Sequence, residues 1–228
     1  KRVLIIGAAR QGLALARYLA KQGASVTLND RLPAEQLSAA ISQLDGTGVR
    51  WELGGHPLGL LENTDLVCVS GGVPLTLPLI RAAIDRGIPL TNDSHIFMET
   101  VKAPTVGITG SAGKTTTTTL FGRMAQAEMK PPRQAWVGGN IGNPLIEFTS
   151  EINTHDLVIQ ELSSFQLELM TTSPRVAAVL NITPNHLDRH AGWNLHLDRG
   201  DGRVDPDLGV AAQDAAEVQF ITGRAPFQ

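Results

Sequence analysis

Buried-strand patterns alternate with amphipathic helix patterns along most of the chain, and this alternation limits the fold more than any other feature. The apolar runs at residues 2–7, 24–30 and 65–72 predict strands, while the segments between them predict helices at 11–23 and 34–44. Strands that are separated by helices of this length favour a parallel sheet with helices on its faces. The sequence therefore predicts an α/β fold.

The same alternation continues further along the chain. Residues 78–87 predict another helix, and residues 88–92 predict a short strand. A new unit of strand, loop and helix then begins at residues 105–110, and residues 155–164 and 175–183 predict two more buried strands. These elements predict a second α/β region that follows the first.

We expect two domains, with a boundary near residues 93–95. A Rossmann-like domain with a parallel sheet is predicted over residues 1–93, and a second α/β domain is predicted over residues 94–228. Beyond about residue 190 the chain becomes polar, rich in Gly and Asp, and only weakly periodic. We therefore expect the second domain to be incomplete, with residues 191–228 unmatched to its pattern.

The composition excludes several classes of partner. The net charge of −3 at pH 7 gives no reason to expect binding to nucleic acid or to an anionic membrane surface. No apolar run approaches the ~20 residues that a membrane-spanning helix needs. The single cysteine, Cys68, cannot form an internal disulfide, which is typical of a reduced compartment. We expect a cytoplasmic monomer with no nucleic-acid partner and no membrane insertion.

The stretch GITGSAGKTTTTTL, at residues 107–120, is built to hold phosphate. Glycines let backbone N–H groups converge on a phosphate, and the following helix adds a favourable dipole. Lys114 can reach the β- and γ-phosphates of a nucleotide, and the Thr115 hydroxyl can bind Mg²⁺. The usual spacing requires glycine where the chain has Ile108, but the core TGSAGKTT is present. We predict nucleotide contacts from the whole loop: Gly110, Ser111, Ala112, Gly113, Lys114, Thr115 and Thr116.

The first loop, GAARQG at residues 7–12, is similar to a dinucleotide-binding fingerprint, but Ala9 occupies its middle glycine position. Asp30 ends the next strand about 20 residues on, where a ribose-binding acid would stand. These residues alone support a domain that binds NAD and a domain that binds a different ligand equally well.

Two further side chains with metal-binding chemistry follow predicted strands. Glu161 ends the strand LVIQE, where a carboxylate beside a phosphate loop commonly binds Mg²⁺; an acid that caps the next turn is the alternative. His186, in NITPNHLDRH, can bind a metal or stack on a base; a surface histidine without a ligand is the alternative. His186 and His190 have the spacing of paired zinc ligands on a helix, but no general-base Glu lies between them, so we reject zinc.

Four motifs occur in order along the chain: TGSAGKTT, GGNIGNPL, ELSSFQLE and NITPNHLDRH. Together they resemble the Mur ligase family of peptidoglycan synthesis, and the resemblance runs from residue 1 to about residue 190. Within that family, a Rossmann-like first domain and the pair Ser111–Ala112 favour the members that add D-glutamate. The resemblance implies a Rossmann-like domain for a UDP-linked substrate, followed by an incomplete, P-loop ATPase-like central domain.

The resemblance also implies ATP-driven amide formation, with ATP and Mg²⁺ as cofactors and UDP-MurNAc-L-Ala and D-glutamate as substrates. The substrate carboxylate would attack the γ-phosphate to form an acyl phosphate, and the amine would then displace phosphate. Lys114, Glu161 and His186 would be catalytic, and Thr115, Glu161 and His186 would lie at the metal. The residues implied at the substrate are Arg10, Gln11, Gly12, Asp30, Arg31, Ser70, Gly71, Gly72, Asn140 and His186.

Two features depart from the family pattern. Ala112 replaces an asparagine that is common in the family's loop. After HLDRH, the family carries a helix with a carbamylated lysine at a second Mg²⁺, whereas the last lysine of this chain is Lys130. We therefore expect the chain to bind substrates without completing amide synthesis. A catalytically incompetent relative that binds UDP-sugar or ATP, another ligase of the family and a polyglutamate synthase remain open.

Overall fold

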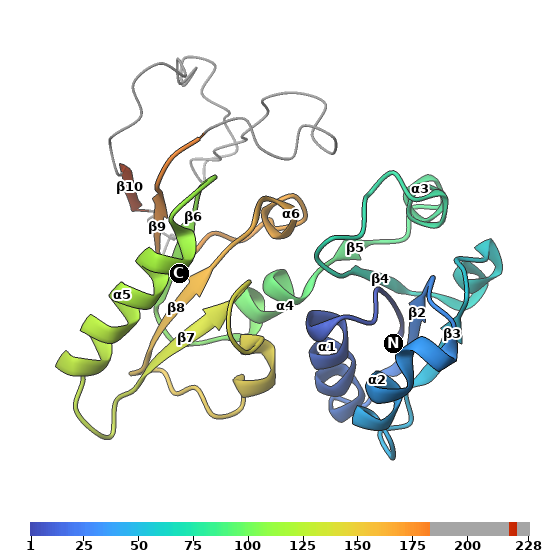
Figure 1. Ribbon diagram of the computed structural model, residues 1–228, viewed down its shortest axis with the longest axis horizontal. Coiled ribbons are helices and arrows are strands. Elements are labelled where there is room, and N and C mark those ends of the chain that lie inside the picture. The colour runs from blue at the N-terminus through green and yellow to red at the C-terminus, as the bar shows by residue number, and fades with distance from the viewer. Residues whose placement is uncertain (183–218, 223–228) are drawn as a thin grey trace. The chain divides into compact units, whose positions relative to one another are not determined.

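The computed structural model describes residues 1–182 and 219–222, and its chain packs into two compact units (Figure 1). The first unit consists of residues 1–100, 143–150 and 165–171, and the described part of the second consists of residues 101–142, 151–164, 172–182 and 219–222. The packing thus changes from the first unit to the second after residue 100, and later segments return to the first unit twice. The domain boundary near residues 93–95 stays a prediction.

A five-stranded parallel sheet forms the centre of the first unit. Its strands, in spatial order, are β3 (Arg50–Leu53), β2 (Ser25–Asp30), β1 (Arg2–Ile6), β4 (Leu66–Val69) and β5 (Leu90–Thr91). All four residues from Val3 to Ile6 are buried, because helices or loops cover both faces of a central parallel strand. The predicted α/β fold with a parallel sheet is confirmed. β3 and the short helix that follows β5 are missing from the prediction.

Helices and 3₁₀ turns connect these strands. They are α1 (Arg10–Lys21), η1 (Ala34–Leu37), α2 (Ser38–Gln43), η2 (Leu58–Asn63), α3 (Pro78–Asp85) and α4 (Asp93–Thr100). The helix predicted over residues 34–44 is split, because Leu37 leaves helical geometry with φ −110° and ψ 12°. The core between the sheet and α3 contains Leu4, Ile6, Val67 and Leu79, each less than 2% exposed.

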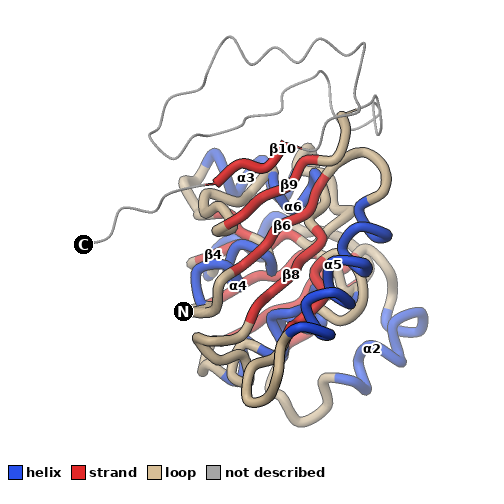
Figure 2. The backbone as a smooth tube through the Cα atoms, turned by 90° about the vertical axis from the view of Figure 1, so that its left-hand side faces the viewer, coloured by secondary structure: helices blue, strands red, loops and turns tan. Residues whose placement is uncertain are grey.

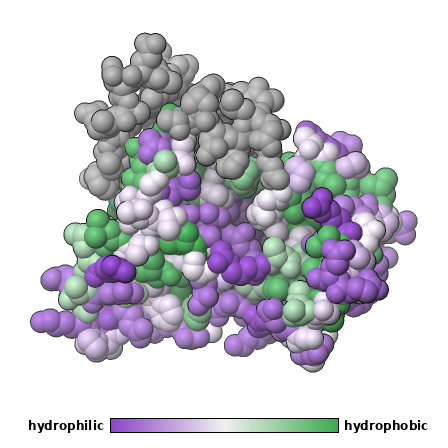
Figure 3. Space-filling view, viewed as in Figure 1, coloured by the Kyte–Doolittle hydropathy of each residue, from purple (hydrophilic) through white to green (hydrophobic). Residues whose placement is uncertain are grey.

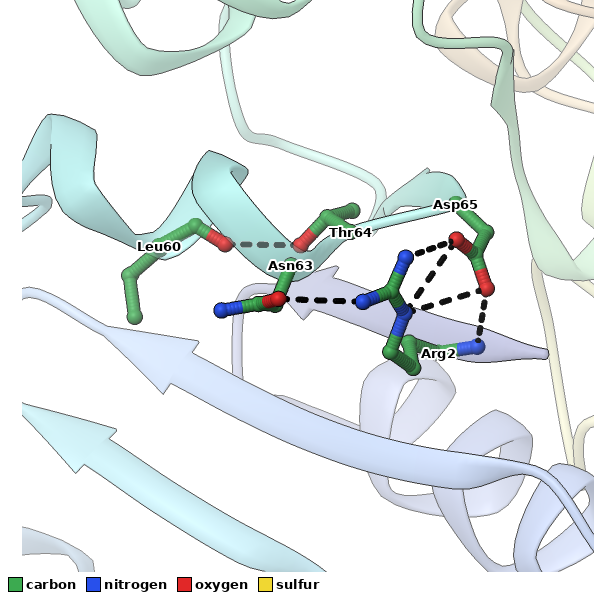
Figure 4. Close-up of polar contacts among 5 residues, drawn as sticks. All are labelled: Arg2, Leu60, Asn63, Thr64 and Asp65. Atoms are coloured by element: carbon green, nitrogen blue, oxygen red, sulfur yellow. Dashed lines mark hydrogen bonds and ion pairs between the residues drawn. The ribbon is translucent and has the colours of Figure 1, made fainter.

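A surface ion pair joins the start of β1 to the start of β4 (Figure 4). The Arg2 guanidinium donates to Asp65 Oδ1 at 2.6 Å and to Asn63 Oδ1 at 3.0 Å, and the Arg2 backbone N–H donates to Asp65 Oδ2 at 2.8 Å. Hydrogen bonds from Arg2 lower the pKa of the Asp65 carboxyl to about 2. Both side chains are exposed, so water screens this pair and it contributes little to stability.

The second unit is built around another five-stranded sheet. Its strands, in spatial order, are β10 (Gln219–Thr222), β9 (Val176–Val179), β6 (Thr105–Thr109), β8 (Leu157–Glu161) and β7 (Ala135–Gly139). β10 is antiparallel to β9, and the other neighbours are parallel. α5 (Lys114–Glu128) runs along one face of this sheet (Figure 2), where Gly122 lies against Val137. β7 is also absent from the prediction.

The outer face of α5 carries exposed hydrophobic side chains. Leu120, Phe121 and Met124 are between 38% and 60% exposed. Figure 3 shows hydrophobic colour among polar atoms over the part of the second unit to which α5 belongs. No helix within residues 1–182 combines the length and the apolar character that crossing a membrane requires.

Two later segments complete the first unit. η3 (Leu145–Phe148) is held by an ion pair between Glu147 and Arg17 of α1. In the other segment, which contains most of α6 (Ser164–Leu167), Gln166 accepts a bond from Asn92 Nδ2 at 2.8 Å. Gln166 Nε2 also donates to Ser94 Oγ at 2.6 Å. The last three residues of the motif GGNIGNPL and the second half of ELSSFQLE therefore belong to the first unit.

The start of α4 holds a buried acid beside this network. Asp93 is 5% exposed, and its Oδ1 has no hydrogen-bond partner within the described residues. Burial raises the pKa of the Asp93 carboxyl to about 6, against the opposing effects of hydrogen bonds from Ser94 and Gln166 and of the Arg10 charge. In the unfolded chain the same carboxyl ionises near pH 3.8. The folded protein therefore binds more protons between about pH 4 and pH 6, and its stability falls as the pH rises through that window.

Replacement of this acid should remove that pH dependence. We expect Asp93→Asn to raise the melting midpoint at pH 8 by on the order of 5 °C, since about 2–3 kcal/mol of ionisation cost disappears. At pH 4 the gain should vanish, because Asp93 is then protonated in the folded protein. Thermal melts at both pH values check this, with the exposed Asp85→Asn as a control that should follow the wild type. An equal gain at both pH values would contradict the assignment.

Candidate functional site

The predicted phosphate loop lies between β6 and α5. Gly110 has a φ of +138°, which side chains rarely adopt, and Gly113 precedes the first residue of α5. The first N–H groups of α5 have no intrahelical acceptor and carry the positive end of the helix dipole. Lys114 Nζ donates to the carbonyl of Gly110 at 2.6 Å and to that of Ser111 at 3.3 Å. A cation and a set of N–H donors therefore meet at one loop.

Glu161, at the end of β8, joins this loop to the neighbouring strand end. The Thr115 hydroxyl donates to Glu161 Oε2 at 2.8 Å, and Asn140 Nδ2 donates to Glu161 Oε1 at 2.8 Å. The backbone N–H of Asn140 donates to the Glu161 carbonyl at 2.9 Å. Glu161 is 2% exposed, so its charge is buried and held by these donors. The structure thus brings together three residues that lie 46 and 21 positions apart.

A glycine lets Asn140 come this close. In the sheet, Glu161 stands opposite both Ile108 of β6 and Gly139 of β7. A Cβ atom at Gly139 would lie 2.5 Å from the Glu161 carbonyl oxygen, which is too close for any side chain. The GGNIG motif therefore has a steric reason at this position, since Gly139 lets the next residue reach the carboxylate.

The donor set at Glu161 fits a hard cation. Mg²⁺ prefers oxygen ligands and is usually bound by one or two carboxylates together with substrate phosphates. Thr115 and Glu161 supply a hydroxyl and a carboxylate next to the phosphate loop. Within residues 1–182, no group of three or more His, Cys, Asp and Glu side chains gathers as a metal site. His186, the third predicted ligand, lies outside the described residues.

Asn181 is a residue of this site that sequence reasoning missed. It follows β9 and faces the phosphate loop from the side opposite to Glu161, because β6 lies between β9 and β8. Its side chain bonds to both the N–H and the carbonyl of Ala112. The available signals were its place near the end of the strand predicted over residues 175–183 and at the start of the motif NITPNHLDRH.

The first unit gathers its predicted residues at the carboxyl edge of its sheet. The loops after β1 and β4 flank the point where strand order reverses, which is where ligands bind in open parallel sheets. Asp30 Oδ2 accepts a bond from the N–H of Ala8 in the first loop at 2.7 Å, and Asp30 Oδ1 accepts one from Leu32 at 3.0 Å. The end of β2 is thereby tied to the first loop.

The two loops at this edge also touch each other. Ser70 Oγ donates to the Gly7 carbonyl at 2.9 Å. A Cβ atom at Gly12 would lie 1.9 Å from the Gly7 carbonyl oxygen, and one at Gly71 would lie 2.6 Å from Gln11 Oε1. Glycine at these positions lets α1 begin directly against the loop after β4.

Several of the predicted substrate residues lie at this edge of the sheet. Gln11 Nε2 is buried and has no hydrogen-bond partner within the described residues, so it is a donor that a ligand can satisfy. Arg10 and Arg31 are exposed at the ends of the first loop and of β2, and Gly72 is exposed after β4. Which ligand these predicted substrate residues bind stays a prediction.

Comparison with known proteins gives two matches to family models. Residues 1–92 match the model described as "Mur ligase MurD-like, N-terminal domain", and residues 108–194 match "Mur ligase middle domain". The UDP-N-acetylmuramoylalanine--D-glutamate ligase of Pelotomaculum thermopropionicum is 46% identical over 191 residues, which is 83% of this chain. The protein of the same name from Geobacter metallireducens is 40% identical over 98% of the chain, so that alignment extends beyond residue 190.

The chain spans 41% and 50% of the lengths of these two relatives. Among solved structures, the UDP-N-acetylmuramate:L-alanyl-gamma-D-glutamyl-meso-diaminopimelate ligase from Neisseria meningitides aligns with a TM-score of 0.52 and 20% identity. That alignment covers 84% of this chain and 64% of the other. At this identity the likeness supports the fold alone.

Proposed function

The chain belongs to the Mur ligase family, and from that membership we propose that it provides the substrate-binding and ATP-binding units of an amide ligase. The reaction joins D-glutamate to UDP-MurNAc-L-Ala, as the names of its relatives state for those proteins. The observation that carries this proposal is the buried Glu161 carboxylate. It accepts one hydrogen bond from Thr115 of the phosphate loop and one from Asn140 of the GGNIG motif.

In the proposed reaction, the substrate carboxylate attacks the γ-phosphorus of ATP, ADP leaves, and an acyl phosphate forms. The amine of D-glutamate then attacks the acyl carbon, and inorganic phosphate leaves. Lys114 gives up its bonds to the Gly110 and Ser111 carbonyls and donates to the phosphate oxygens instead. The N–H groups at the start of α5 stabilise the charge that builds on the same oxygens.

The Thr115 hydroxyl and the Glu161 carboxylate would hold Mg²⁺, and Asn140 would keep that carboxylate in place. When bound, Mg²⁺ supplies positive charge that offsets the phosphate oxygens. The chain's own residues orient the carboxylate, because both oxygens of Glu161 already accept hydrogen bonds in the absence of a ligand.

In the first unit, we assign the UDP end of the substrate to the carboxyl edge of the sheet. Arg10 and Arg31 supply positive charge, and the buried Gln11 amide supplies a donor. Asp30 accepts a hydrogen bond from the first loop and so ties that loop to the end of β2. This end of the substrate takes no part in bond making, so it serves to position the reacting carboxylate. Because the reaction consumes ATP and a UDP-linked precursor, we assign it to the cytoplasm, and we expect a monomer.

Loss of the phosphate-loop lysine tests the ATP assignment. We expect Lys114→Ala to weaken ATP binding by about 10- to 100-fold, because a charged hydrogen bond to phosphate is lost. Thermal stability should stay the same, since Lys114 contacts loop carbonyls and no core side chain. Calorimetry with ATP measures the effect, and Lys130→Ala, an exposed lysine after α5, is the matched control. Equal affinity in the two variants would refute the role of Lys114.

The ligand of the first unit is tested by comparing the affinities of two nucleotides. We expect UDP-MurNAc-L-Ala to bind more tightly than NAD, because Ala9 departs from the glycine pattern of NAD-binding loops. Calorimetry on the 228-residue chain with each compound gives the order of affinity. Tighter binding of NAD would show that this unit is a dinucleotide-binding domain instead.

Binding without turnover is the second candidate function, and one observation favours it. Residues 131–228 contain no lysine, whereas the family resemblance implies a carbamylated lysine after HLDRH. We expect the chain to bind UDP-MurNAc-L-Ala and ATP but to form no ligated product at ~1 s⁻¹, a rate typical of enzymes. Mass spectrometry of the mixture with D-glutamate, or with L-alanine in its place, checks this. Product at that rate would overturn the expectation and identify the amino acid.

A further inference from the structure

Asn181 holds the phosphate loop by three hydrogen bonds from one residue. Its side-chain Oδ1 accepts from the Ala112 N–H at 2.8 Å, and its Nδ2 donates to the Ala112 carbonyl at 2.9 Å. Its backbone carbonyl accepts from the Ser111 N–H at 3.0 Å. The N–H and the carbonyl of Ala112 and the N–H of Ser111 are therefore all hydrogen-bonded to Asn181, which lies about 70 positions later in the chain.

The geometry requires an amide at this position. Asn carries an acceptor and a donor on one flat group, so it matches the N–H and the C=O of a single residue. The reversed amide orientation would set a donor against the Ala112 N–H and an acceptor against the Ala112 carbonyl. No other side chain of similar size offers both groups in this arrangement.

The contact continues the β6–β9 ladder beyond the strands. Thr109 stands opposite Val179, and the Leu180 N–H donates to the Thr109 carbonyl at 3.0 Å. The bond from Ser111 to Asn181 is the next in that series. Gly110 has a φ of +138°, and a Cβ atom there would lie 3.1 Å from both the N and the O of Asn181, so a side chain at this position would be strained and tightly packed.

We propose that Asn181 is a positioning residue that fixes residues 110–112 so that the start of α5 receives the nucleotide phosphates. This proposal rests on the proposed ATP-binding function. Asn181 occupies the N–H groups of Ser111 and Ala112, so these two backbone donors, which the sequence had counted among the nucleotide contacts, are already used. The first N–H groups of α5 and the Lys114 ammonium are left for phosphate. A loop that is ordered before ATP arrives loses less conformational entropy on binding.

The Asn181 side chain makes its contacts at Ala112, whose own side chain has no polar group. Ala112 carries only a methyl group and is exposed, so it cannot form a polar contact that would order the loop from within. Asn181 supplies that contact from the end of β9. Together with Glu161 from the end of β8, it holds the loop and the first turn of α5 from two neighbouring strands.

The test is ATP and ADP calorimetry on the 228-residue chain and two variants. We expect Asn181→Ala to weaken the binding of both nucleotides about 10-fold, because two hydrogen bonds that order the loop are lost. Asn181→Asp keeps an acceptor for Ala112 but loses the donor and adds a negative charge beside the phosphates. It should lose at least as much affinity, and it provides the same comparison if the alanine variant does not fold.

Two controls separate positioning from general destabilisation. Asn153→Ala removes an exposed asparagine of the same unit whose Nδ2 donates to the Glu151 carbonyl at 3.1 Å, and it should bind ATP like the wild type. Affinity for UDP-MurNAc-L-Ala, which is assigned to the first unit, should not change in the Asn181 variants.

Three outcomes would overturn the inference. Equal or tighter ATP binding by Asn181→Ala would show that the side chain does not order the loop or that it competes with phosphate. A fall in melting midpoint with parallel losses of ATP and UDP-MurNAc-L-Ala affinity would show a structural role only. A wild-type chain that fails to bind ATP would overturn the proposed function and this inference together, and is thereby distinguishable from the other two.

Discussion

The hydrogen bonds to the buried Glu161 carboxylate hold together the carboxyl ends of β6, β7 and β8 in the second unit. A carboxylate that is 2% exposed needs donors for its oxygens, and Thr115 and Asn140 provide one each. Those two donors stand on the elements that follow β6 and β7, so one charge fixes the ends of three strands relative to one another. Removal of either donor would leave one buried carboxylate oxygen without a hydrogen bond, which is costly in a protein interior.

The strand order explains why the phosphate loop is held from two sides. β6 lies between β8 and β9, so the loop after it emerges between the ends of its two neighbours. Glu161 comes from one neighbour and Asn181 follows the other. In the first unit the corresponding loop after β1 lies between β2 and β4, and it is held by Asp30 and Ser70 in the same manner. In each of the two sheets, the loop after a central strand is therefore held by residues from both neighbouring parallel strands.

The sequence predicted those parts of the fold and site that depend on local pattern. Apolar runs marked the central strands, and glycines beside Lys114 marked the phosphate loop, because each signal lies within a few residues. β3 and β7 were missed because their exposed or glycine-rich residues give no apolar run. Asn181 was missed because its role is a contact with Ala112 that no local spacing reveals. The return of residues 143–150 and 165–171 to the first unit likewise depends on distant partners such as Arg17 and Ser94.

Because the first unit is built from three separate segments of the chain, it cannot be completed until the last of these segments has been synthesised. A ribosome releases residues 1–100 first, yet the partners of Arg17, Asn92 and Ser94 come from segments that end at residue 171. At cellular rates of translation, the intervening chain takes roughly 4 to 14 s to make. During that interval the nascent first unit lacks η3 and α6 and leaves the polar groups that bond Gln166 open to water. Its completion therefore waits until residue 171 has been made, by which point β6, β7 and β8 of the second unit have been synthesised but β9 and β10 have not.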